Sequence, residues 1–172
     1  MGYRTSWIAA DGLGVEELAS SLGWRLTGDS SSEHDEPGMV AFRRGQWSVV
    51  VADGYAHWKE LGLKLASEIP HQGQVLYFRQ SDGDMESELV CLQQGKVIWR
   101  IEYTEGEINA DGSLPDHREI RERLKAYAQS SGSGTRSVAY LYELPAELGL
   151  TLVGFRHDER VADDLFYALE KA

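Results

Sequence analysis

The sequence predicts an α+β fold: a mainly antiparallel, twisted sheet of about six to eight strands with about three to five helices packed against it. Residues that alternate between apolar and polar mark several short strands, and apolar residues at helical spacing mark the helices. Strands and helices come in runs instead of alternating regularly, which favours antiparallel pairing. The 172 residues, 42% of them hydrophobic, suffice for one core. We therefore expect a single globular domain over residues 1–172.

The first elements are a strand, a helix and a second extended segment. Residues 3–10 alternate as a strand near a sheet edge does, and residues 15–22 carry a buried helical stripe that Gly23 ends. Residues 24–27 then resume an extended form. Residues 28–38 are polar and acidic with no apolar face, which predicts a flexible, exposed loop.

The middle of the chain predicts a hairpin, a helix and a meander. Residues 39–42 and 47–52 flank a turn, and the second of these segments is apolar on both faces, so we place it centrally in the sheet. A helix over residues 58–69 follows. Three strands, 74–80, 85–93 and 96–104, come next, and the last two form the clearest hairpin.

The C-terminal third predicts three more helices and one strand. A helix begins after Ser113 as N-cap and carries an i, i+4 pair between Glu119 and Arg123. A Ser/Gly linker, 130–136, lies inside the domain. Beyond it we expect a strand over 137–144, a helix over 145–152 and a terminal helix over 158–170 with Asp158 as its N-cap.

All of the net charge of −11 lies in three short acidic stretches. Residues 29–36, 82–88 and 102–116 hold thirteen of the 28 Asp and Glu residues and no Lys or Arg. The rest of the chain is close to neutral, so the acidity is local. If the stretches meet in space, they form a negative surface suited to a cationic partner.

Composition disfavours several classes of protein. The negative balance disfavours nucleic acid and anionic membrane surfaces as partners, and no apolar run approaches the roughly 20 residues that span a bilayer. The single cysteine, Cys91, forms no internal disulfide, and the N-terminus lacks the apolar stretch of a signal peptide. We therefore expect a cytoplasmic protein.

The sequence gives only weak indications of a catalytic or metal-binding site. His157 precedes two acids in a run that could serve acid/base or metal chemistry, but consecutive side chains point in different directions. Asp82 and Asp84 resemble half of a calcium loop whose full spacing fails. Cys91 lies among aliphatic residues and is expected to be inert. No catalytic motif stands out, so we expect no enzyme, no cofactor and no resident metal.

The aromatic residues divide into two groups. Trp7, Trp47 and Trp99 occur on apolar strand faces and are expected in the core. Trp24, Tyr55 and Trp58 adjoin loops or a helix start, where they are either ordinary core residues or exposed anchors for a partner.

Two segments resemble a known family. The opening Tyr-Arg-Thr-Ser-Trp-Ile-Ala, residues 3–9, and the late Pro-Ala-Glu-Leu and Gly-Phe-Arg-His-Asp, residues 145–148 and 154–158, look like those of a family of small uncharacterised bacterial proteins. The resemblance spans most of the chain and brings no activity with it. It implies a bacterial, cytosolic origin.

These observations favour a binding protein that neutralises a basic protein partner, most concretely an immunity protein against a secreted bacterial toxin. Carboxylates would occupy the place of an anionic substrate and speed association. Two alternatives stay open: a small metal-assisted or acid/base enzyme centred on His157, and an adaptor or scaffold domain of unknown partner. The candidate partner-binding residues are Glu33, Asp35, Glu36, Trp58, Asp82, Asp84, Glu86, Glu88, Glu105 and Glu107.

Overall fold

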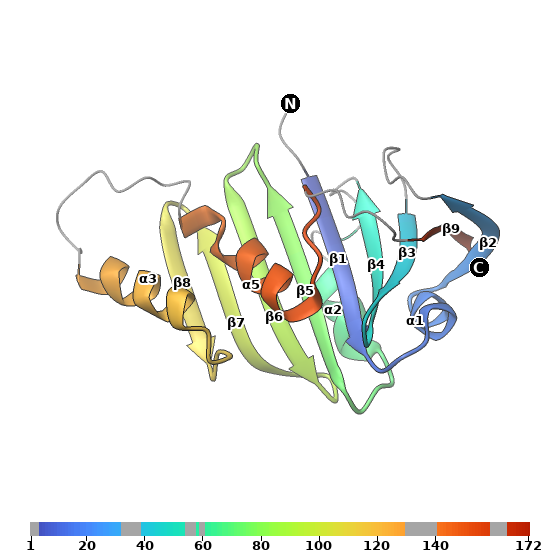
Figure 1. Cartoon of the computed structure of the whole chain (residues 1–172), viewed down its shortest axis with the longest axis horizontal. Helices are drawn as coiled ribbons and strands as arrows, with labels where there is room; N and C mark the ends of the chain where they lie inside the picture. The colour runs from blue at the N-terminus through green and yellow to red at the C-terminus, as the bar shows by residue number, and fades with distance from the viewer. Residues whose placement is uncertain (1–3, 32–38, 54–57, 59–60, 130–140, 159–164) are drawn as a thin grey trace.

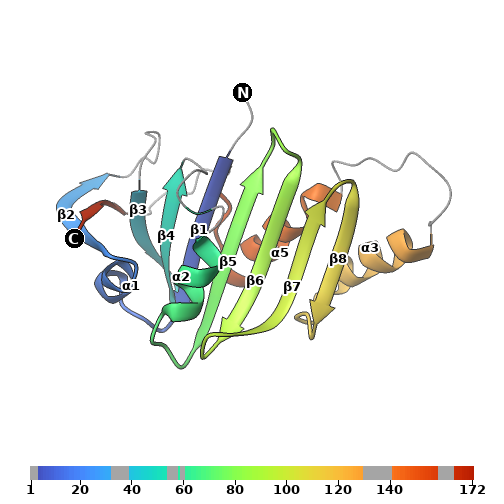
Figure 2. The same ribbon diagram turned by 180° about the vertical axis from the view of Figure 1, so that it is seen from behind.

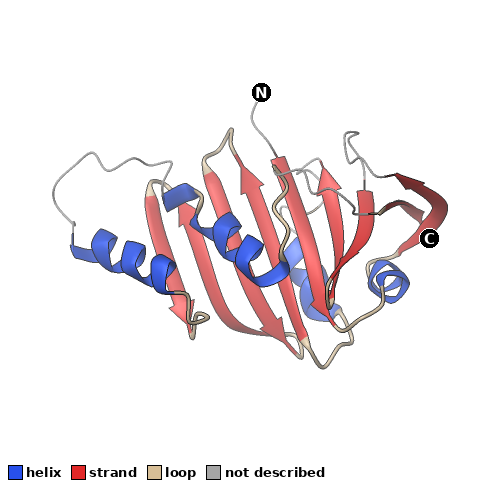
Figure 3. Cartoon of the chain, viewed as in Figure 1, coloured by secondary structure: helices blue, strands red, loops and turns tan. Residues whose placement is uncertain are grey.

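A computed structural model describes residues 4–31, 39–53, 58, 61–129, 141–158 and 165–172. In these residues, nine strands form a single sheet in the order β2-β9-β3-β4-β1-β5-β6-β7-β8, and every pair of neighbours is antiparallel. Four described helices pack against it (Figure 1, Figure 3). The α+β class is confirmed, and the sheet has more strands than the predicted six to eight.

The strands are β1 (Arg4–Asp11), β2 (Trp24–Ser31), β3 (Met39–Arg44), β4 (Trp47–Asp53), β5 (Gln74–Ser81), β6 (Glu86–Gln93), β7 (Lys96–Thr104), β8 (Glu107–Gly112) and β9 (Phe166–Lys171). The helices are α1 (Val15–Ser21), α2 (Gly62–Glu68), α3 (Arg118–Gln129) and α5 (Leu144–Val153). β4 lies between β3 and β1, the central position that its two apolar faces predicted.

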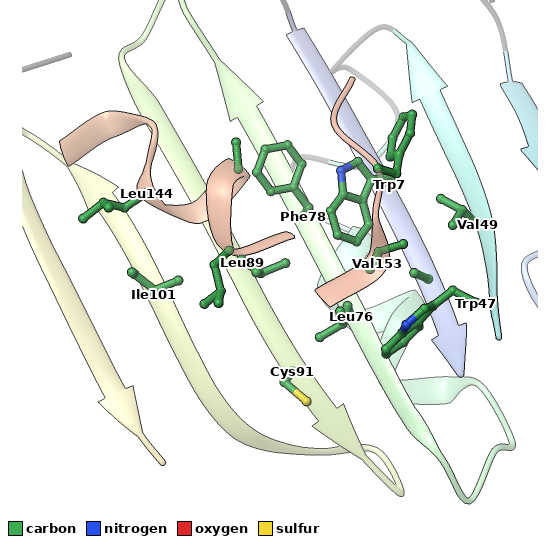
Figure 4. Packing of buried hydrophobic residues seen from close by; sticks show 14 of the residues in the cluster. Trp7, Trp47, Val49, Leu76, Phe78, Leu89, Cys91, Ile101, Leu144 and Val153 are labelled. Carbon is green, nitrogen blue, oxygen red and sulfur yellow. The ribbon is translucent and has the colours of Figure 1, made fainter. Parts of the chain in front are cut away.

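Helices cover both faces of the sheet. α3 and α5 lie on one face, here called the front face, and α1 and α2 lie on the other, the back face (Figure 1, Figure 2). Successive residues of a strand point to opposite faces. Trp7 and Phe78 therefore belong to the front core, shown in Figure 4, whereas Ile8 and Tyr77 belong to the back core. The core positions predicted for Trp7, Trp47 and Trp99 are confirmed.

A glycine lets one helix on each face approach the sheet closely. A Cβ added to Gly149 of α5 would lie 2.9 Å from the indole of Trp7, and one added to Gly62 of α2 would lie 2.4 Å from the ring of Tyr77. Real Cβ atoms do not approach other heavy atoms so closely, so a larger residue would push the helix away from the sheet. The two glycines set the spacing between the layers.

The C-terminal prediction is wrong. Phe166–Lys171 is a strand, β9, inserted between β2 and β3, and not the end of a helix over 158–170. Residues 159–164 of the predicted helix lie outside the described residues, and Asp158 accepts hydrogen bonds from Arg156 at 2.6 and 3.0 Å. The described end of the strand predicted over 137–144 is helical at Leu141 and Tyr142.

Other elements also differ from the prediction. β8 lies inside the third acidic stretch, where no strand was predicted. α3 begins at Arg118, five residues beyond the predicted N-cap Ser113, although its pair between Glu119 and Arg123 is present at 2.8 Å. Of the predicted loop over 28–38, residues 28–31 belong to β2 and the rest lies outside the described residues.

Candidate partner-binding surface

Two of the three acidic stretches lie side by side. Residues 82–88 form the β5–β6 turn and the start of β6, and residues 102–112 form the end of β7, the next turn and β8. Because β6, β7 and β8 are consecutive in the sheet, these stretches are neighbours. Of the first stretch, only residues 29–31 are described, and they belong to β2 at the other end of the sheet. Three of its residues, Glu33, Asp35 and Glu36, lie outside the described residues.

The pairing register brings the acids of the two stretches onto the back face. Glu88 lies opposite Glu102, which lies opposite Asn109, and Arg100 lies opposite Asp111. Residues that oppose each other in a ladder point to the same face. We call this part of the sheet the open face and define it by the residues that point out of it: Glu86, Glu88, Arg100, Glu102, Glu107, Asn109 and Asp111.

No described helix covers the open face. α2 lies over β5 and its neighbours, and α1 lies further toward β3, so that the backs of β7 and β8 face outward (Figure 2). Glu107, Asn109 and Asp111 are exposed, whereas Arg100 and Glu102 are half-buried. The sheet thus presents a polar surface at this end.

A chain of alternating charges runs across three strands of this surface. Arg79 of β5 bonds Glu86 at 2.9 Å and Glu88 at 2.7 Å, and Arg100 of β7 bonds Glu88 at 2.6 Å and Glu102 at 3.1 Å. The central carboxylate, Glu88, has only 4% of its side chain exposed. A buried carboxylate requires such partners because its charge loses its hydration. Glu88 therefore organises the two arginines and is shielded from a partner by them.

Two acids of the open face add net negative charge to it. Glu107 and Asp111 have no ion-pair partner among the described residues, and both are exposed. Glu105 stands beside them at the tip of the β7–β8 turn, also exposed. This corner is the part of the surface where a cation meets uncompensated carboxylates.

In the β5–β6 turn, one of the acidic side chains stabilises the fold. Asp82 accepts hydrogen bonds from the hydroxyl of Tyr142 at 2.6 Å and from the amide of Gln80 at 3.2 Å. Burial, reinforced by the hydrogen bond to Asp82, raises the pKa of Tyr142. Asp84 binds Ser81 at 2.7 Å but is exposed. Asp82 thus ties the β5–β6 turn to the segment before α5, and Asp84 is the more accessible acid.

The predicted aromatic anchor is not on the surface. Trp58 is 2% exposed, and its carbonyl accepts a hydrogen bond from Tyr77 at 3.0 Å. It belongs to the back core because α2 follows it closely and packs on the sheet. Three exposed apolar residues were not anticipated from the sequence: Met85 in the acidic β5–β6 turn, and Val97 and Ile98 at the other end of the open face, near the β6–β7 turn. Met85 could have been noticed, since it stands alone among four acids.

His157 lies near two carboxylates that a neighbouring arginine engages. Arg156 pairs with both Glu143 and Asp158, while the ring of His157 lies 5.8 Å from that of Phe78. Burial, only partly offset by Arg156, raises the pKa of Glu143. Burial alone would also raise the pKa of Asp158, but hydrogen bonds from Arg156 and nearby positive charge outweigh it and lower that pKa. Among the described residues, no three His, Cys, Asp or Glu side chains are arranged to hold a metal.

Comparison with known proteins found no matching family model, no matching curated protein and no matching solved structure. In the part of the chain that the structure describes, no helix is long and apolar enough to cross a membrane. The geometry of the open face is therefore the main guide to function.

Proposed function

We propose that this chain is an acidic binding protein that neutralises a basic protein partner, most concretely an immunity protein against a secreted bacterial toxin, and that the partner docks on the open face. The observation that carries the proposal is the convergence of two separate acidic stretches on one sheet surface without a described helix over it. A cytoplasmic location belongs to the same proposal, because such a protein meets its target where the target acts.

The surface is suited to rapid and specific binding of cations. Its carboxylates project from paired strands, and the chain from Glu86 through Arg79, Glu88 and Arg100 to Glu102 restrains their positions. A preorganised surface loses little conformational entropy on binding. Local negative charge also raises the rate of encounter with a basic protein, and salt weakens that effect.

Exposed apolar residues at the rim supply the contact area that charge alone does not. Met85, Val97 and Ile98 are 38%, 52% and 41% exposed. Charged pairs at an interface contribute mainly to specificity and association rate, whereas buried apolar anchors contribute much of the affinity. A partner with a basic centre and small apolar groups at its margin fits this arrangement.

The first experiment is a low-salt pull-down from the native bacterium with the purified protein as bait, followed by a salt step and identification of the released protein. A basic toxin-like domain released by salt, whose activity the bait inhibits at equimolar concentration, is the expected result. Release of no basic protein, or of one whose activity is unchanged, contradicts the proposal.

Charge variants then locate the surface. The triple variant Glu102→Gln, Glu107→Gln, Asp111→Asn should slow association with the released partner about tenfold at low ionic strength. The matched control Glu16→Gln, Glu122→Gln, Glu170→Gln removes the same charge from α1, α3 and β9. Equal slowing by both variants would mean that only net charge matters and that the open face is not the docking surface.

A further inference from the structure

β8 is an end strand whose outer edge has no partner among the described residues. The sheet order ends at β8, and β7 is its single neighbour. Among the described residues, no backbone–backbone hydrogen bond outside the β7–β8 ladder involves β8. Its register with β7 runs without a shift from the pair of Thr104 and Glu107 to the pair of Trp99 and Gly112. β8 is thus a regular strand with an unpaired edge.

The turn before β8 determines which backbone groups point outward. Glu105 and Gly106, its two central residues, both have positive φ, at 52° and 84°, as a type I′ turn requires. The residues that flank a two-residue hairpin turn form a hydrogen-bonded pair, so Thr104 and Glu107 exchange both of their bonds. Pairs alternate along the ladder. The N–H and C=O groups of Ile108 and Ala110 therefore face the free edge.

The opposite edge of the sheet differs. β2 pairs with β9 in two parts, and the register shifts between Leu26 and Ser30. Bulges of this kind disturb an edge and make it a poor template for another strand. Of the two edges, the one at β8 is the regular one.

The charge pattern of β8 indicates which kind of strand can pair with its free edge. Glu107 and Asp111 lie on the open face, whereas Ile108 and Ala110 lie on the front face. If two copies of the chain paired through this edge in an antiparallel register centred on Asn109, Glu107 of each copy would oppose Asp111 of the other. Like charges placed opposite each other destabilise a strand pair. A strand with Lys or Arg at every second position meets these acids favourably.

We infer that the basic partner docks by adding a strand to β8, with cationic side chains over the open face and small apolar side chains on the front face. This inference rests on the proposed function and specifies how the partner is held. Backbone hydrogen bonds would supply affinity, and the alternating acids would supply specificity, as in other complexes formed by strand addition.

A designed hairpin peptide tests the edge directly. The probe is an Asn-Gly hairpin whose outer strand alternates Lys and Val, with a control in which Glu replaces Lys. In the free protein the amides of Ile108 and Ala110 should exchange with solvent much faster than those of Glu107 and Asn109. The Lys probe should slow exchange at Ile108 and Ala110 by about tenfold or more. No protection at these two amides overturns the inference.

Two further results would show that something other than a basic strand pairs with the edge of β8. Protection that the Glu probe gives equally would show that charge does not select the strand. Protection that grows with protein concentration, without any probe, would identify a second copy of this chain as the occupant. Either result overturns the inference of a basic strand.

A proline variant tests the natural complex. Ala110→Pro removes an outward N–H and no bond to β7, and edge positions of this kind tolerate proline. Ala110→Thr is the matched control that keeps the N–H. With an unchanged thermal midpoint, Ala110→Pro should weaken binding of the salt-released partner about tenfold relative to Ala110→Thr. Equal binding by the two variants overturns strand addition and leaves the proposed function intact, whereas failure to capture a basic partner counts against the proposed function itself.

Discussion

Glu88 of β6 lies directly opposite Glu102 of β7, and Arg100 bonds both carboxylates. Two acids in this position repel each other unless a cation stands between them. Arg79 holds Glu88 from the other side, at 2.7 Å. The negative charge of the open face is thus arranged in a fixed pattern by two arginines that β5 and β7 supply.

The stability of this arrangement should depend on Arg100. Arg100→Gln should lower the free energy of unfolding by about 2 kcal/mol, because it leaves Glu88 with one arginine and opposite an uncompensated Glu102. Adding Glu102→Gln should restore part of that loss by removing the repulsion. Urea unfolding of the single and double variants measures both effects. Losses that simply add would show that the two side chains do not interact.

The first acidic stretch is expected to assist the encounter through its charge. Glu33→Gln, Asp35→Asn, Glu36→Gln should slow association with the partner at low ionic strength. Stopped-flow rates over a salt series check this, and the difference from wild type should vanish near 1 M salt, where the screening length is about 3 Å. An unchanged rate at low salt would exclude this stretch from the electrostatic surface.

Cys91 should make the fold sensitive to alkali. Burial raises the pKa of its thiol from 9.0 to about 11, which favours the protonated form in the folded state. A group with a raised pKa stabilises the fold fully below its unfolded pKa and loses that contribution as pH rises. Wild type should therefore lose about 2 kcal/mol relative to Cys91→Ala between pH 9 and 11. Parallel urea-unfolding curves for the two proteins over that range would contradict the prediction.

Replacing Gly149 with alanine, which adds only a methyl group, should lower the stability of the fold. Gly→Ala in a helix is usually stabilising by up to about 1 kcal/mol, but here the added methyl would meet Trp7 at 2.9 Å. We expect Gly149→Ala to lower stability by about 1–3 kcal/mol. Thr151→Ala, at an exposed position of the same helix, should change it by less than about 0.5 kcal/mol. Thermal unfolding of both variants measures the contrast.

Tyr142 should link the β5–β6 turn to the rest of the front core. Tyr142→Phe removes the hydrogen bond to Asp82 and leaves that half-buried carboxylate with fewer donors, at a cost of about 1–2 kcal/mol. Amide exchange at Gly83 and Asp84 should quicken at the same time. A loss of stability without faster exchange at the turn would show that the bond does not restrain it.

The periodicity of the sequence was sufficient to predict the direction of the side chains where one face of a strand is clearly apolar. Trp99, Ile101 and Tyr103 are buried on the front face while Arg100 and Glu102 lie on the back face, as the alternation predicted. Val97, which the same alternation placed with Trp99, is instead 52% exposed, because the register shifts at this point of the ladder. The same alternation, extended to β6, places Glu88 with Glu102. The convergence of the two acidic stretches could therefore have been predicted from the sequence, whereas the burial of Glu88 beneath two arginines could not.

The elements that were misassigned from the sequence owe their structure to pairing with other strands of the sheet. In β8 only Ile108 is deeply buried, so the strand has no apolar pattern of its own and depends on pairing with β7. In β9, Phe166 belongs to the front core and Leu169 packs against the back core. A helix would place residues three apart on one face, whereas a strand places them on opposite faces. The apolar spacing alone did not reveal that difference.

The contrast between the two ends of the sheet limits the size of any assembly formed through it. A strand that joins β8 finds no equally regular acceptor at the β2 end of another copy, because the β2 ladder is interrupted between Leu26 and Ser30. Head-to-tail growth into a fibre requires two compatible edges on every molecule. With one acceptor edge, the chain terminates growth after a single addition, so its complexes should keep a one-to-one stoichiometry even when both components are concentrated.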